Sequence, residues 1–571
     1  MLLALLASCG QGGAAIDPAL SSALDAAGPG GRVPVIVRYA GGATPRLIPP
    51  GAPDRAALRA RALREAMQQN LSVHERVRPL LEARGIADAS RLWIVNGASF
   101  AADAGAIRAL AQHPDVASIS LDRPLRLAAP SRAAATPTAP AWNLGAIHAP
   151  EAWAAGHTGR GAVVAVLDTG VDAKHPDLAP RWRGGPGDWF DAFGTRPAPG
   201  DPQGHGTQVA GLIVGGDASG SAIGVAPGAR WIAAKIFDDA GASSSSAIHR
   251  AFQWALDPDG DPSTDDAPDV VNNSWGMREN VGECITDFDD DLAALRAAGI
   301  AVVFSAGDGG PAASSSMSPA NAAGALSVGS VDSLLAIEHD SSRGPSACGG
   351  GLFPALSAPG SGVRTSDLTY GGAFPGSYAT VSGTSFAAPH LSGVLAIVRA
   401  AAPSATMEQI EQALAATAID LGVAGPDNDF GGGLLDVAAA LRLLAVPDED
   451  AGVDAGTADA GDDAGGGNDD AGGVDGGVVD AGAPLDAGTA SDAESAPDAG
   501  AGSDAGHPAP DASDSQLNPT QGAGNAAGSG GCTTITVDAA PGGATWTMLA
   551  CAALMFMLRR WPTDRSARRL P

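Results

Sequence analysis

Residues 383–390 read GTSFAAPH, a tight Gly-Thr-Ser turn that runs into an Ala-rich apolar segment predicted to be helical through Val398. Ser385 therefore lies at a predicted helix N-terminus, where free backbone N–H groups and the helix dipole favour developing negative charge. A serine hydroxyl is a weak nucleophile and needs a base, which in turn needs an orienting acid. A catalytic role for Ser385 therefore requires a histidine and an aspartate in matching settings elsewhere in the chain.

Two residues stand in such settings. Residues 162–172 read AVVAVLDTGVD, a buried strand that ends at Asp168, and such strand ends form the mouth of an α/β sheet. His205 lies between two glycines, which allow close backbone approach, and it opens a predicted helix. Alone, Asp168 also fits a turn residue and His205 a structural histidine. Together with Ser385 they supply the acid, the base and the nucleophile.

The strings DTGVDxxHPDL, HGTxVAG and GTSFAAPH, in this order, resemble those of the subtilisin-like serine proteases, the peptidase S8 family. The resemblance covers residues 143–445, taken as the catalytic domain, and implies a three-layer α/β fold with a central parallel sheet. Shorter strings agree with it: GVAP at 224–227, NSWG at 273–276, SRGP at 342–345, APG at 358–360 and GGGLLD at 431–436. It implies that Ser385 attacks the scissile carbonyl, His205 carries the proton and Asp168 orients the imidazole.

The resemblance also assigns an oxyanion hole and a substrate cleft. The oxyanion hole would comprise Asp308 and the backbone of Ser385, and Met317 would give the pocket floor an apolar character. The backbones expected to line the cleft and pair with an extended peptide are those of Ser274, Trp275, Gly276, Ser305, Ala306 and Gly307.

One position departs from the family pattern. The family string Ala-Ala-Gly-Asn-x-Gly reads SAGDGG at residues 305–310, so that Asp308 replaces the asparagine that donates to the oxyanion. An ionised aspartate has no proton to donate, and loss of one donor costs on the order of 10²–10³ in rate. A protonated aspartate could still donate. We therefore expect a peptidase that either works better below neutral pH than its relatives or is slow.

The apolar runs predict the layers of the catalytic domain. Strands are expected at 162–167, 231–237, 270–273, 301–304 and 325–331. They alternate with helices expected at 208–214, 245–255, 289–298, 387–401 and 407–416. Buried strands that alternate with helices predict a parallel sheet covered on both faces.

Residues 31–127 predict a small β-α-β-α-β unit. Its elements are strands at 33–39, 92–98 and 116–121 and helices at 54–84 and 104–112. This order resembles the inhibitor-type propeptide of the same family, a ferredoxin-like α+β domain; an unrelated ferredoxin-like module is the alternative. Residues 128–140 form an Ala/Pro/Ser/Thr connector where a processing cut could fall.

The remaining segments predict export and tethering. Residues 1–10 resemble a signal with a lipobox in which Cys9 would be lipidated, and a plain export signal is the alternative. Residues 447–531 contain no Lys or Arg and consist of Asp-Ala-Gly repeats, which predict a disordered linker. Residues 532–571 combine Cys532, an apolar run at 544–558 and terminal arginines. They resemble a myxobacterial C-terminal sorting tail, and an ordinary membrane anchor is the alternative.

The composition of the chain limits the classes of partner that it can bind. The net charge of −29 argues against nucleic acid as a partner. The partners expected are polypeptide substrates, the chain's own propeptide, and a membrane or cell surface reached by the C-terminal segment. Export makes a disulfide between Cys284 and Cys348 plausible but does not decide it.

The chemistry needs no cofactor, and the resemblance allows structural calcium without ligands being assigned. The acidic runs at 265–266 and 289–291 are interpreted as solvated loops or helix starts. The function that fits best is an exported or surface-anchored serine endopeptidase made as a zymogen. The alternative is a catalytically weak subtilisin-shaped binding module, and a lipase-like hydrolase is disfavoured because Ser385 lacks a G-x-S-x-G elbow.

Overall fold

The computed structural model describes residues 14–41, 55–127, 131–134, 141–372 and 375–445. The predictions for residues 1–10, 447–531 and 532–571 lie outside these ranges. Among the described residues, no helix has the length and apolar character that crossing a membrane requires.

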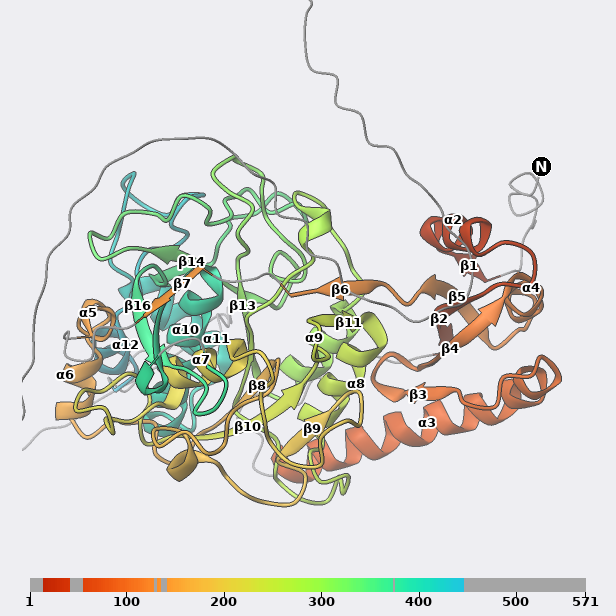
Figure 1. The fold of residues 1–571 in the computed structure, drawn as a ribbon, viewed down its shortest axis with the longest axis horizontal. Helices are drawn as coiled ribbons and strands as arrows, with labels where there is room; N and C mark the ends of the chain where they lie inside the picture. Colours follow the sequence, from red (N-terminus) through yellow and green to blue (C-terminus); the bar gives the residue numbers. More distant parts are fainter. Residues whose placement is uncertain (1–13, 42–54, 128–130, 135–140, 373–374, 446–571) are drawn as a thin grey trace, which may run out of the picture. The chain divides into compact units, whose positions relative to one another are not determined.

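A seven-stranded parallel sheet forms the centre of the large domain (Figure 1). Its strand order is β15-β14-β13-β12-β8-β10-β9. The strands are β8 (Val163–Asp168), β9 (Trp189–Asp191), β10 (Arg230–Lys235), β12 (Val270–Asn273), β13 (Ala301–Ser305), β14 (Leu326–Val331) and β15 (Leu356–Pro359). The subtilisin-like α/β architecture with a large parallel sheet is thereby confirmed.

Helices cover both faces of this sheet (Figure 1). Successive side chains of a strand point to opposite faces, so Val164 and Val166 of β8 join one core with α7 (His205–Val214) and α10 (Thr384–Ala401). Ala165 and Leu167 join the other core with α8 (Ser245–Leu256) and α9 (Asp289–Ala297). A strand that is buried on both faces needs a near-continuous run of apolar residues. These strands could therefore be predicted from the sequence.

Smaller elements surround this core. A three-stranded antiparallel sheet joins β16 (Val363–Ser366), β17 (Tyr378–Ser382) and β7 (Ser131–Ala134), and β17 leads directly to the turn before Ser385. The remaining helices are α5 (Trp142–Ala146), α6 (Ala149–Ala154), α11 (Met407–Thr417) and α12 (Val437–Leu444), with short 3-10 turns at Ala179–Arg181, Arg278–Asn280 and Pro375–Ser377.

The N-terminal region forms a separate five-stranded sheet of order β1-β5-β2-β4-β3. Its strands are β1 (Ala15–Ile16), β2 (Arg32–Tyr39), β3 (Ser90–Leu92), β4 (Gly97–Asp103) and β5 (Val116–Leu121). Its helices are α2 (Pro18–Ala27), α3 (Arg55–Ala83) and α4 (Ala104–Ala111). The strand expected at 92–98 is wrong in its extent, because a 3-10 turn at Trp93–Val95 and a left-handed Asn96 separate β3 from β4.

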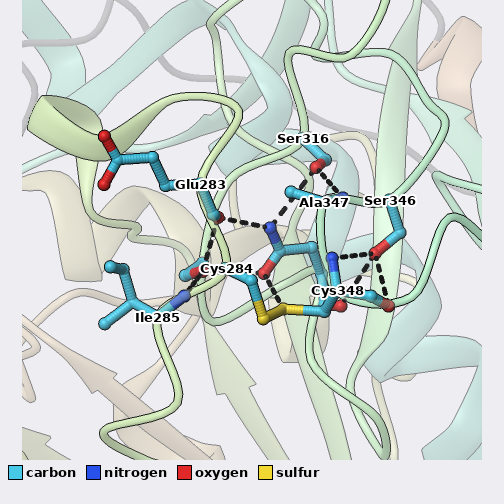
Figure 2. The surroundings of a disulfide bond; sticks show 9 residues. Glu283, Cys284, Ile285, Ser316, Ser346, Ala347 and Cys348 are labelled. Atoms are coloured by element: carbon cyan, nitrogen blue, oxygen red, sulfur yellow. Dashed lines mark hydrogen bonds between the residues drawn. A yellow bond between two sulfur atoms is a disulfide. The ribbon is translucent and has the colours of Figure 1, made fainter.

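A disulfide bond joins Cys284 to Cys348, 64 residues apart (Figure 2). The side chain of Asn321 lies beside it, where its Nδ2 donates to the carbonyl of Glu283 and its Oδ1 accepts from Ser318. Cys348 Sγ is also 3.5 Å from Asn321 Oδ1. The bridge therefore joins two surface loops beside the buried side-chain amide of Asn321. The sequence alone did not decide whether these two cysteines pair.

Removal of this bridge should destabilise the protein. The double variant Cys284→Ser/Cys348→Ser should lose up to about 4 kcal/mol of unfolding free energy, because closure of a loop of this length restricts the unfolded chain. Urea unfolding measures the loss. Dithiothreitol should lower the wild type to the level of the variant and leave the variant unchanged. Equal stability of the two oxidised proteins would contradict a structural role for the bridge.

Candidate active site

Asp168 ends β8, an interior strand of the sheet. The chain adds β9 and β10 on one side of β8 and then returns to add β12 on the other side, so the strand order changes direction at this point. In open α/β sheets, sites form outside the carboxyl ends of the strands at such a change. The side chain of Asp168 is fully buried, and its Oδ1 accepts from the N–H of Thr169 and lies 2.7 Å from His205 Nδ1.

His205 begins α7 and is held there by Asp201. Oδ1 of Asp201 accepts from the N–H groups of Gln203 and Gly204, and Oδ2 accepts from both the N–H and the hydroxyl of Thr207. The carboxylate thereby satisfies backbone donors at the start of the helix.

Opposing effects act on the His205 imidazole. Burial lowers its pKa, but the neighbouring charge of Asp168, its hydrogen bond, and the charges of Asp201 and Asp308 outweigh burial and leave the pKa raised. The ring therefore accepts a proton more readily than a free imidazole. A base of this kind suits proton transfer near neutral pH.

The close approach of α7 to β8 requires glycine at position 206. A Cβ atom there would lie 2.1 Å from the carbonyl oxygen of Gly170, which is backbone and cannot move aside cheaply. Gly206 N–H instead donates to Thr169 Oγ1 over 2.9 Å. The Gly-His-Gly pattern therefore serves to bring the imidazole onto the end of β8.

Ser385 lies in the first turn of α10. Its hydroxyl donates to the carbonyl of Ser274 over 3.2 Å, and Ser274 Oγ donates back to the Ser385 carbonyl over 2.7 Å. The ring of the next residue, Phe386, is 5.5 Å from the His205 ring between centroids. The structure thus brings the three residues of the expected triad to one edge of the sheet, with the Ser385 hydroxyl bonded to Ser274 rather than to His205 among the described residues.

Asp308 lies against the same turn. Its Oδ1 accepts from both the N–H and the hydroxyl of Thr384, over 2.9 and 2.8 Å. Thr384 Oγ1 in turn accepts from Gly307 N–H over 3.1 Å. Oδ1 is therefore engaged as an acceptor, and only Oδ2 remains to face a ligand.

The residues expected to line the cleft contribute unequally. Trp275 packs its ring against Phe288 and Phe304 in the core, so only its backbone can meet a substrate. Ser305 and Ala306 are likewise buried. The side chain of Met317 lies between the backbone at Gly276 and the backbone at Gly307, since a Cβ atom on either glycine would come within 2.8 Å of it. Met317 therefore forms an apolar floor between the two cleft-lining backbones.

A strand from the N-terminal region lies along the edge of the site. β6 (Pro124–Arg126) pairs antiparallel with β11 (Ala242–Ser244), and Leu127 N–H donates to the carbonyl of Gly241. A cavity of about 600 Å³ separates β6 from residues 276–280, on the opposite side. An extended chain thus already occupies the space between β11 and the Gly276 segment.

Sequence reasoning missed three residues of this site. Asp201 and Thr169 accept hydrogen bonds from the backbone next to His205, and Thr384, which precedes Ser385, accepts from Gly307 N–H; none of the three is a candidate for chemistry itself. The signal for Asp201 was present, since an aspartate a few residues before a helix start commonly caps it. Thr169 and Thr384 lie within the recognised strings, where their hydroxyls gave no separate signal.

Comparison with known proteins agrees with this geometry. Residues 159–433 match the model of the subtilase family, peptidase S8. The chain is 34% identical over 306 residues to Subtilisin Savinase of Lederbergia lenta and to M-protease of Shouchella clausii, which covers 53% of this chain and 98% and 70% of those proteins. It is also 34% identical over 387 residues to Bacillopeptidase F of Bacillus subtilis, covering 62% of this chain but only 26% of that protein. With the site's geometry and near-complete coverage of a known subtilisin, the chain belongs to the subtilase family of serine-type endopeptidases.

Proposed function

We propose that the chain hydrolyses peptide bonds with the triad Asp168, His205 and Ser385. The supporting observation is the buried Asp168–His205 hydrogen bond of 2.7 Å beside the first turn of α10. Asp168 holds the proton of Nδ1, so the other ring nitrogen is free to accept the proton of the Ser385 hydroxyl as it attacks the carbonyl. The protonated imidazole then gives that proton to the leaving amine. The bond from Ser385 to Ser274 is compatible with this role, since catalytic hydrogen bonds often tighten only when substrate binds.

Polypeptides are the substrates that suit the cleft. β11 offers a strand edge to β6, and an extended substrate would pair with the same edge once β6 has left. Met317 favours an apolar side chain in the pocket that lies between Gly276 and Gly307.

The N-terminal region acts in this proposal as an intramolecular inhibitor. β6 ends beside Gly241, and β7 begins at Ser131, which pairs with Ser382, three residues before Ser385. Only three residues, 128–130, separate these two anchored positions in the sequence. This short separation supports a processing cut in the first residues of the connector at 128–140.

Export with surface attachment fits the same proposal. The Cys284–Cys348 disulfide supports an oxidising compartment. The resemblances of the two end segments support passage through a membrane and retention at the surface.

A binding module without turnover is the second candidate, and Asp308 is the observation that favours it. Catalysis has stronger support, because the buried Asp168–His205 pair lies at the carboxyl end of a sheet strand beside the turn that carries Ser385. We therefore propose a peptidase whose oxyanion hole lacks one donor. Its turnover is slow because the position that donates to the oxyanion holds a carboxylate.

Replacement of Asp308 by asparagine tests this account. In the Asp308→Asn variant, the amide oxygen can keep both bonds from Thr384 while Nδ2 donates to the oxyanion, so kcat/KM near pH 8 should rise on the order of 10²-fold. The Asp308 charge raises the pKa of His205. Its removal should lower that pKa and move the acid limb of the pH–rate profile to lower pH. Glu408→Gln, an exposed carboxylate on α11, is the matched control. Unchanged turnover at neutral pH would show that Asp308 does not limit the reaction.

Replacement of the nucleophile tests both catalysis and processing. The Ser385→Ala chain should remain full length and take no label from a fluorophosphonate probe, whereas the wild type should be labelled. Mass spectrometry of the mature wild type should place its new N-terminus between Leu127 and Ser131. Ser333→Ala, at an exposed turn serine, should behave as wild type. A wild type that takes no label would support the binding module instead.

A further inference from the structure

A loop far from the triad brings three carboxylates together. The loop runs between α8 and β12, and ligand atoms from Asp257, Asp259 and Asp266 all lie within 4.8 Å of one another. The cluster includes Asp266 of the acidic run at 265–266, which the sequence predicts to belong to a solvated loop. The cluster by itself would not indicate a ligand, because acidic groups are common on protein surfaces.

Asp257 supplies the independent observation. Its side chain is only 7% exposed, and neither of its carboxylate oxygens has a hydrogen-bond partner within the described residues. An ionised carboxylate that is buried without partners is costly. The ligand atoms of Asp257, Asp259 and Asp266 lie within 4.8 Å of one another, so the unpartnered carboxylate of Asp257 faces the other two.

The neighbouring arginines are engaged elsewhere. Arg183 donates through Nε to the Asp188 carboxylate and through Nη1 to the backbone carbonyl of Asp266. Arg59 of α3 forms an ion pair with Asp265, the carboxylate next to the cluster. Neither guanidinium forms a hydrogen bond or ion pair with Asp257 within the described residues.

The loop holds the cluster in a defined geometry. Asp266 Oδ2 accepts from Asp259 N–H over 2.9 Å, and Asp259 Oδ1 accepts from Asp261 N–H and from the Thr264 hydroxyl. These bonds occupy only part of the acceptor capacity of the two carboxylates. Both Asp257 oxygens remain available, and the exposure of Asp259 leaves the cluster open to water on one side.

We propose that Asp257, Asp259 and Asp266 bind a calcium ion. All three candidate ligands are carboxylate oxygens, which hard cations prefer, and no histidine or cysteine belongs to the cluster. Calcium accepts irregular arrangements of carboxylates and water, whereas magnesium demands near-ideal octahedral geometry. The ion supplies the positive charge that Asp257 lacks.

The proposed site lies in the loop between α8 and β12, and these elements connect to the two walls of the cleft. β11 directly precedes α8, which ends at Leu256 just before Asp257. After the loop, β12 leads directly to Ser274. A cation here would therefore join the far ends of the two elements that position the substrate-binding backbones, and its first effect should be on stability.

The test compares stability with and without calcium in the full chain, with Ser385→Ala as the background to prevent self-digestion. In 1 mM CaCl₂ the parent should melt roughly 5 °C higher than in EDTA, if the site is nearly saturated. The melting temperature of Asp257→Asn relative to the parent should depend on whether calcium is present. The variant should melt at or above the parent in EDTA, because a buried charge has been removed, and below the parent in calcium.

Calorimetric titration with CaCl₂ gives the second readout. Asp257→Asn should bind one ion fewer than the parent, and Asp265→Asn, a carboxylate of the same loop outside the cluster, should keep the parent's stoichiometry. Terbium, as a luminescent substitute for calcium, should be sensitised by Trp254, three residues before Asp257, and should lose this emission in Asp257→Asn. An Asp257→Asn chain that keeps the parent's stoichiometry, or that melts below the parent equally in EDTA and calcium, would overturn the proposal.

Discussion

The hydrogen bond between Asp168 and His205 depends on a particular meeting of strand and helix. Asp168 reaches the imidazole because β8, an interior strand of the sheet, ends beside the start of α7. That approach in turn requires a residue without a side chain at Gly206 and a carboxylate, Asp201, that satisfies the start of α7. A single methyl group at position 206 would separate the two elements and with them the acid from the base.

Much of this arrangement could be predicted from sequence because buried parallel strands need continuous apolar runs. The apolar run at 162–167, followed by Asp168, predicted β8. The glycines around His205 predicted that another part of the backbone approaches closely there. Short edge elements such as β9 and β11 gave no such signal, since two or three residues carry too little periodicity. The turn at 93–95 was missed because Trp93, Ile94 and Val95 are apolar residues that suit a strand, and only the left-handed Asn96 interrupts them. The buried state of Asp257 depends on tertiary packing and could not be predicted from an acidic loop.

In the proposed mechanism, Asp308 acts on two parts of the same reaction. As a charge it raises the pKa of His205, which makes the imidazole a stronger base. As an acceptor it binds Thr384 and presents no amide to the oxyanion. Strengthening a base that is already assisted by Asp168 gains little, whereas an oxyanion donor acts directly on the charge that develops in the transition state. The loss should therefore dominate, and the local contacts explain why the site tolerates the aspartate structurally: Thr384 is satisfied equally well by a carboxylate or an amide.

The N-terminal region contributes more than a strand in the cleft. Asp122 accepts from both the N–H and the hydroxyl of Ser246 at the start of α8, over 2.8 and 2.7 Å, and is itself buried. The helix's own cap is weak by comparison, because Ser244 Oγ accepts from Ala247 N–H only over 3.4 Å. A carboxylate at this end also complements the helix dipole. In the proposed zymogen, these contacts to α8 and β11 would both support the cleft wall and place a strand across the cleft.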